Sequence, residues 1–115
     1  MAKCDQGYIC EVCGEPVQGI INSSLYLRYV IGEVAAHQLL STPERHLLCD
    51  AELAQYISDE YFEDKYQSAG LSAGFFAKEH LDPAFVKQRE ELVSRGYQRL
   101  KEVISLKIPV SEYQL

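Results

Sequence analysis

The apolar positions between residues 17 and 31 favour two β-strands joined by a turn. Residues 17–21 contain valine and two isoleucines, and the Asn-Ser-Ser sequence at 22–24 has a composition typical of turns. Residues 25–31 are rich in Leu, Tyr, Val and Ile, and in a strand their side chains would alternate between two faces. Gly32 ends this run. The pattern therefore predicts a β-hairpin over residues 17–31.

After Gly32 the apolar positions follow helical spacing. Residues 33–40 are compatible with a short helix. Thr42 followed by Pro43 is a helix-start signal, because threonine is a good N-cap and proline suits the first helical turn. We therefore expect helix over residues 43–57, with room for an interruption inside it.

The segment that follows contains a second helical stretch and a connector. Residues 58–66 either continue the preceding helix or begin a new one capped by Ser58, and Gly70 is a suitable residue to end it. The connector over residues 70–81 carries an aromatic pair at positions 75 and 76. We expect these aromatic side chains to fill part of the core.

The clearest helix signal lies near the C-terminus. Asp82 and Pro83 provide an N-cap and a first helical residue. The helix must end before Pro109, because proline disrupts the interior of a helix. The prediction is a helix from 83 to about 105. Its apolar seam has helical spacing and consists of Val86, Val93, Tyr97, Leu100 and Ile104.

The composition is that of an ordinary globular domain. The 115 residues are 47% hydrophobic and 24% charged, so we expect a single domain spanning 1–115. A net charge of −6 disfavours binding to nucleic acid or to anionic membranes. The longest apolar runs are too short for a transmembrane helix, and the first residues lack a signal-peptide core. We expect a cytoplasmic location, where thiols stay reduced.

Two short motifs carry the candidate chemistry. Cys10 and Cys13 form a C-x-x-C-G unit with Gly14, and His46 and Cys49 form an H-x-x-C unit 32 residues later. Zinc binds four tetrahedral nitrogen or sulfur ligands, and two chelating pairs separated by a loop supply them. A complete Cys3His set leaves no open coordination position, so the sequence predicts a structural zinc site.

Other interpretations of the cysteines stay open. Cys4 could replace His46 as the fourth ligand, and iron could occupy a cysteine-rich site instead of zinc. The four thiols could also be ordinary buried side chains. A C-x-x-C unit can form a redox-active dithiol, but this chemistry normally uses the start of a helix, and Gly14 and Pro16 disfavour a helix there.

The order of these motifs resembles the treble-clef zinc fingers. In those domains a C-x-x-C-G knuckle provides two ligands, a hairpin follows, and the start of a helix provides the other two. The resemblance covers residues 8–58 and implies a zinc-binding subdomain there, with residues 59–115 as a helical part. The expected fold class is α+β: a small zinc-bound hairpin unit packed with two or more helices, the last of them long.

Several other residues have mainly structural interpretations. His37 has no partner at ligand spacing, and His80 lies beside Glu79 near a helix start, where a solvated role is favoured over that of a general base. The aromatic residues of the acidic stretch could anchor a partner or pack in the core. They are Tyr56, Tyr61, Phe62 and Tyr66.

Taken together, these features predict a non-enzymatic protein that acts through protein contacts, as an adaptor or regulator. A nucleic-acid-binding regulator is one alternative, although glutamates interleave with its candidate basic residues, Arg95, Arg99, Lys101 and Lys107. A C-x-x-C thiol redox protein is the other. The apolar seam of the last helix could pack within the chain or join two copies into a homo-oligomer.

Overall fold

The computed structural model describes residues 8–70, 74 and 77–115. The fold is mainly helical, with one short antiparallel pair of strands near the N-terminus. In chain order the strands and α-helices are β1 (Tyr8–Ile9), β2 (Pro16–Val17), α1 (Ser24–Val30), α2 (Ala51–Ala54), α3 (Glu60–Ser68) and α4 (Pro83–Leu106). Short 3-10 helices lie between them or follow them: η1 (Ile20–Asn22), η2 (Ala36–Leu40), η3 (Leu47–Cys49), η5 (Lys78–His80) and η6 (Val110–Glu112).

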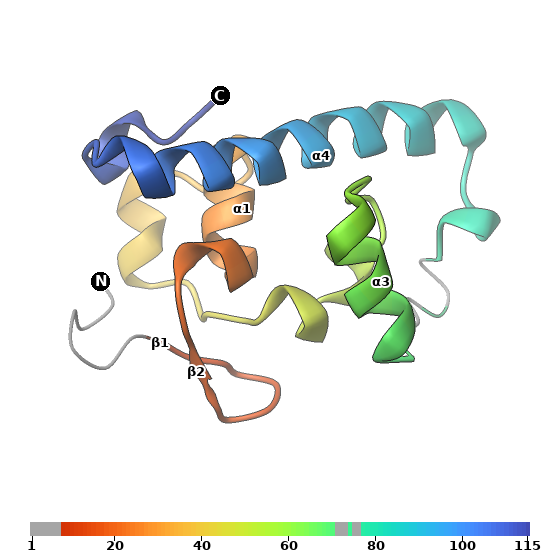
Figure 1. Cartoon of the computed structure of the whole chain (residues 1–115), viewed down its shortest axis with the longest axis horizontal. Helices are drawn as coiled ribbons and strands as arrows, with labels where there is room; N and C mark the ends of the chain where they lie inside the picture. The colour runs from red at the N-terminus through yellow and green to blue at the C-terminus, as the bar shows by residue number, and fades with distance from the viewer. Residues whose placement is uncertain (1–7, 71–73, 75–76) are drawn as a thin grey trace.

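Helix α4 runs along one side of the molecule, and the β1–β2 hairpin projects from the opposite side (Figure 1). Helix α1 packs directly on α4. The most deeply buried apolar side chains belong to one core cluster, to which both halves of the chain contribute: Leu27, Tyr29, Leu47, Leu53, Ile57, Val93 and Leu100. Within the described part of the chain, no helix is both long and apolar enough to cross a lipid bilayer.

The hairpin predicted over residues 17–31 is wrong, because η1 and α1 together occupy most of that segment. Ser23, which the sequence pattern placed in a turn, is the N-cap of α1, and its Oγ accepts a hydrogen bond from the backbone N–H of Tyr26 at 3.0 Å. Five of the seven α1 side chains are buried apolar ones, so packing overrides their preference for strands. The strands lie upstream instead, where Tyr8 pairs with Val17 and Ile9 with Pro16.

The helix predicted over residues 43–57 is also wrong in its first half. Glu44 forms a backbone bridge with Cys10, and His46 forms one with Ser23. The carbonyl of Glu44 accepts a hydrogen bond from the N–H of Glu11 at 2.9 Å. These bonds hold residues 44–46 extended, so helical structure begins only at η3 and α2. The short helix expected at 33–40 is present only over Ala36–Leu40, as the 3-10 helix η2.

The remaining elements agree better with the sequence pattern. Helix α3 is a separate helix that ends before Gly70, but its N-cap is Asp59 and not Ser58. Asp59 accepts a hydrogen bond from the N–H of Phe62 at 3.0 Å. Helix α4 starts at Pro83 as predicted, although the Asp82 side chain forms no capping hydrogen bond. The aromatic pair at 75 and 76 lies outside the described residues.

The apolar seam of α4 packs against other elements of the same chain. Val93, Tyr97 and Leu100 are buried in the core, whereas Ile104 is 55% exposed and Val103 takes the buried position at 3%. The periodicity of 3.6 residues allows either position after Leu100, so the neighbouring elements decide which one is buried. This seam therefore packs against α1 in the single chain.

Gly96 of α4 is in close contact with side chains of α1 and of the residue that follows it. A Cβ atom added there would overlap Cγ2 of Ile31 and would lie 3.0 Å from Cδ1 of Leu27. We expect Gly96→Ala to lower the free energy of unfolding by about 1–3 kcal/mol, because overpacking outweighs the better helix propensity of alanine. Urea denaturation would measure this, with Gln88→Ala at an exposed site of the same helix as the control. An unchanged or raised midpoint for Gly96→Ala would contradict the close packing.

The cap of α3 gives a second stability test. A hydrogen bond from Lys101 lowers the pKa of Asp59 despite partial burial. Asp59→Ala should therefore lower the free energy of unfolding by about 1 kcal/mol, whereas Ser58→Ala should change it little. The contribution of Asp59 is present above the ordinary pKa of an aspartate, about 3.9, and is lost as the pH falls through the lower pKa of the folded protein. Equal effects of the two substitutions in thermal unfolding would exclude Asp59 as the cap.

Candidate metal centre

Cys10 and Cys13 lie in the turn that connects β1 to β2. The N–H of Gly14 donates to the carbonyl of Cys10 at 3.0 Å, and the N–H of Cys10 donates to the carbonyl of Glu15 at 2.9 Å. Gly14 has φ 77°, a left-handed conformation that glycine adopts without strain, as its position after the C-x-x-C unit predicted. The N–H of Val12 points at Cys10 Sγ, 3.4 Å away. This turn brings both thiols to one side of the hairpin.

His46 and Cys49 lie at the two ends of a single helical turn. His46 is the N-cap of η3 and Cys49 is its last residue, and the N–H of Cys49 donates to the carbonyl of His46 at 3.0 Å. The backbone N–H of His46 also lies 3.5 Å from Cys10 Sγ, so the second pair contacts the first directly. Helix α2 begins two residues after Cys49.

The four candidate ligand atoms form one compact cluster. The Sγ atoms of Cys10, Cys13 and Cys49 and a ring nitrogen of His46 all lie within 4.8 Å of one another. His46 Nδ1 is 3.3 Å from Cys13 Sγ and 3.9 Å from Cys49 Sγ. Tetrahedral zinc, with Zn–N near 2.0 Å and Zn–S near 2.3 Å, separates its ligand atoms by roughly 3.5–3.8 Å. The cluster therefore has the donor chemistry and the size to hold one metal ion.

The orientation of the His46 ring also suits metal binding. Its Nε2 atom is 3.0 Å from the carbonyl oxygen of Pro16 in β2. A proton on Nε2 would donate to that carbonyl and would leave the lone pair of Nδ1 directed toward the sulfurs. Histidines that bind metals commonly donate their second ring N–H to an acceptor of this kind.

Two buried carboxylates bracket the ligand-bearing segment 44–50. Both carboxylate oxygens of Glu44 lie 2.8 Å from Ser23 Oγ, and two backbone amides donate to the same group. Asp50 accepts a hydrogen bond from Ser24 Oγ at 2.5 Å and forms an ion pair with Arg28 at 3.1 Å. Two consecutive serines at the start of α1 thus hold both ends of the segment that carries His46 and Cys49.

The sequence analysis missed both carboxylates. Their serine partners lie 21 and 26 residues away, and no spacing rule connects such distant positions. Burial raises the pKa of Glu44 although the hydroxyl of Ser23 hydrogen-bonds it. A buried and fully hydrogen-bonded carboxylate of this kind acts as a structural connection between segments.

The protein environment lowers the pKa of Cys10 and raises the pKa of Cys49. Burial opposes ionisation of Cys10, but hydrogen bonds from the backbone amides of Cys13, His46 and Val12 lower its pKa to about 6. Burial, followed by hydrogen bonds to Cys10 and Cys13, raises the pKa of Cys49 to about 12. A cation bound in the cluster would stabilise all three groups as thiolates.

The other candidate residues lie apart from this cluster or outside the described ranges. Cys4 belongs to residues 1–7, which the structure does not describe. His37 and His80 are exposed on η2 and η5 and are not part of the cluster. Among the basic residues considered for nucleic acid, Arg99 donates to the carbonyls of residues 112 and 113, and Lys101 pairs with Asp59.

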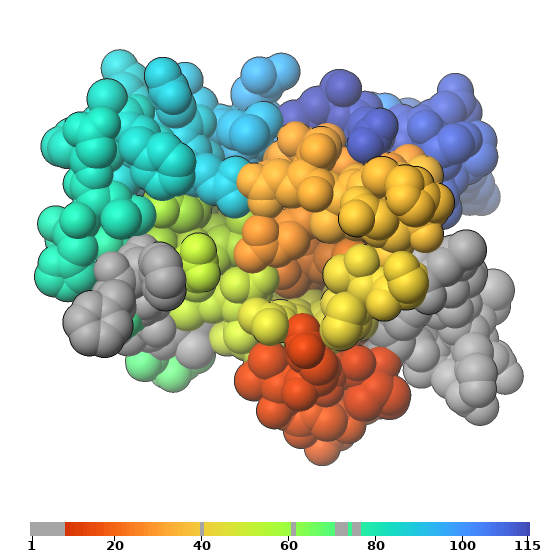
Figure 2. All heavy atoms as spheres, turned by 180° about the vertical axis from the view of Figure 1, so that it is seen from behind, coloured from red at the N-terminus to blue at the C-terminus, as the bar shows by residue number. Residues whose placement is uncertain are grey.

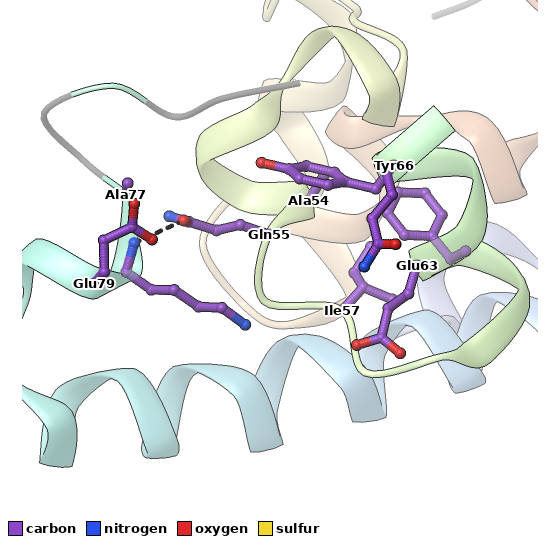
Figure 3. Close-up of a pocket in the computed structure, with 10 residues that line it drawn as sticks. Ala54, Gln55, Ile57, Glu63, Tyr66, Ala77 and Glu79 are labelled. Carbon is purple, nitrogen blue, oxygen red and sulfur yellow. Dashed lines mark hydrogen bonds between the residues drawn. The ribbon is translucent and has the colours of Figure 1, made fainter. Parts of the chain in front are cut away.

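Several cavities adjoin the helices, and two of them differ in their position relative to the candidate metal centre. One of about 250 Å³ borders the metal-ligand cluster, and its lining includes His46, Cys49 and Phe62. The other, of about 260 Å³, lies between α2, α3 and η5 (Figure 3). There, Gln55 Oε1 accepts a hydrogen bond from the N–H of Lys78 at 2.8 Å, and the described lining contains neither histidine nor cysteine. Of these two cavities, the first borders candidate ligands and the second does not.

No family model, no curated protein and no solved structure matches this chain. Interpretation of the site therefore depends on its donor atoms and their geometry. Three sulfurs and one imidazole nitrogen within 4.8 Å of one another indicate a metal-binding site.

The fourth ligand can be tested with one pair of variants. We expect His46→Ala to lose bound metal, because it removes one of the four clustered donor atoms, and Cys4→Ser to retain it. Elemental mass spectrometry on protein purified without chelator would measure metal per chain. Metal retained by His46→Ala but lost by Cys4→Ser would instead assign Cys4 as the fourth ligand.

Proposed function

We propose that Cys10, Cys13, His46 and Cys49 bind one zinc ion whose role is structural. The observation that supports this best is the convergence of four zinc-type donor atoms within 4.8 Å. With four protein ligands the ion has no open position for water or substrate, which is typical of structural and not catalytic sites. Thiolate ligands require reducing conditions, so a cytoplasmic location fits this role.

We further propose that residues 8–58 have a treble-clef-like arrangement. The C-x-x-C-G unit lies in the turn of a hairpin, as in a zinc knuckle, and the H-x-x-C unit immediately precedes α2. Between the two units, however, this chain has α1 and not the expected second hairpin. The resemblance is therefore limited to the way in which the two ligand pairs are presented.

The proposed function is that of a non-enzymatic adaptor or regulator that contacts another protein. The support comes from the hairpin, which projects from the body of the molecule (Figure 2). It carries Ile9 and Val12, which are 56% and 57% exposed. Ile104 and Leu106 are exposed apolar side chains near the end of α4, and we propose this end of the helix as the place where a second copy of the chain would pack.

The two alternative functions have less support. Arg99 and Lys101 are engaged within the chain, and these internal contacts compete with binding to phosphate. The C-x-x-C unit lies in a hairpin turn and not at the start of a helix, the usual place of a redox-active dithiol, although backbone amides lower the pKa of Cys10 to about 6.

Metal content and folding together test the structural role. We expect about one zinc per chain, and we expect chelation to reduce helicity measured by circular dichroism, because metal binding and folding are coupled in such sites. Cys13→Ser and Cys49→Ser should behave like the chelated protein. A protein that binds zinc but keeps the same helicity and thermal midpoint after chelation would contradict a structural role.

The alternatives predict different results in the same preparation. A nucleic-acid-binding regulator would bind labelled DNA or RNA with an affinity that falls steeply with salt and weakens in Arg95→Ala. A thiol redox protein would be isolated without metal and would reduce disulfide substrates repeatedly. We expect neither result. Turnover lost specifically in His80→Ala would contradict the non-enzymatic assignment.

A further inference from the structure

We propose that Cys13 is a site of oxidation by hydroperoxides, and that its oxidation to a Cys10–Cys13 disulfide expels the zinc ion. This inference depends on the proposed zinc site. The three cluster cysteines differ sharply in access to solvent: Cys10 is 1% exposed, Cys49 is partly buried, and Cys13 is exposed at the tip of the hairpin. A small oxidant dissolved in water therefore meets Cys13 first.

The cluster supplies a second thiolate to complete the reaction. All three sulfurs lie within 4.8 Å of one another, so an oxidised Cys13 has two neighbours within reach. Cys10 is the better-placed one, because the hydrogen bonds of the hairpin turn hold it beside Cys13 independently of any metal. Cys49 belongs to another segment, which backbone bonds at residues 44–46 and the proposed ion together hold against the hairpin. Departure of the ion removes one of these constraints on Cys49, whereas Cys10 stays in the same hydrogen-bonded turn as Cys13.

The chemistry balances with one hydrogen peroxide molecule and two protons taken from solvent. The Cys13 thiolate attacks the peroxide, an S–O bond forms, the O–O bond breaks, and the first water leaves after protonation. The Cys10 thiolate then attacks the Cys13 sulfur, an S–S bond forms, the S–O bond breaks, and the second water leaves. The two sulfurs lose two electrons in total, the peroxide gains them, and the zinc ion keeps its charge. With two of its four ligands removed, the ion leaves the site.

Loss of the ion would affect the surface that we propose for protein contacts. Backbone bonds join Cys10 and Glu11 to residues 44–46, and the metal would add a direct link between the C-x-x-C turn and Cys49. Val12 lies inside the turn that the oxidation restructures. Peroxide would therefore weaken binding of a partner to this hairpin.

The experiment treats zinc-loaded protein with an equimolar amount of hydrogen peroxide and measures released zinc with a colorimetric chelator. Digestion with trypsin gives a peptide 4–28 that contains Cys10 and Cys13 and a peptide 46–65 that contains Cys49. Mapping is done in the Cys4→Ser variant, because Cys4 lies in the first peptide. We expect one zinc released per disulfide formed and peptide 4–28 lighter by two hydrogens. A disulfide between the two peptides, or zinc retained after peroxide, would overturn the proposal.

Two matched variants isolate the role of Cys13. Cys13→His and Cys49→His each keep four potential ligands, but only the first removes the exposed thiolate. Zinc release should be slower by about tenfold or more in Cys13→His, because the thiolate is the nucleophile. Equal rates would overturn the proposal. Protein that contains no zinc before treatment would instead contradict the proposed function, so the two failures are distinguishable.

Discussion

The structure depends on the attachment of one short segment, residues 44–50, to the start of α1. Ser23 binds the carboxylate of Glu44 and Ser24 binds that of Asp50, so consecutive hydroxyls fix the two ends of the segment that carries His46 and Cys49. These hydrogen bonds are buried, and losing one partner of such a pair typically costs about 1–3 kcal/mol. Together with the backbone bonds from Glu11 to Glu44 and from Ser24 to Arg45, they position the second ligand pair relative to the first.

The same helix connects the candidate metal centre to the rest of the core. Helix α1 packs against α4 where Gly96 allows a close approach, and the C-terminal tail closes over the other side of α1. The hydroxyl of Tyr29 donates to the carbonyl of Val110 at 2.9 Å, and the N–H of Leu115 donates to the carbonyl of Val30 at 3.1 Å. Helix α1 therefore contacts both the segment that carries the second ligand pair and helix α4.

Local signals were sufficient to predict some of this arrangement. Pro83 and the long apolar seam predicted α4, and the spacing within each ligand pair predicted the four residues that the fold brings together. Segment 17–31 was predicted as strands because its side chains favour strands. The cap at Ser23 and burial on nearly all sides of α1 determine the observed helix. The role of Glu44 could not be predicted, because its partner is distant in sequence.

The central claim is that three sulfurs and one nitrogen bind a single zinc ion. X-ray absorption at the zinc edge, on the full chain purified without chelator, measures the number and type of ligand atoms directly. The expected result is three sulfurs near 2.3 Å and one nitrogen near 2.0 Å. Four sulfurs, which would require Cys4 in place of His46, or a shell dominated by oxygen would contradict the assignment of this site.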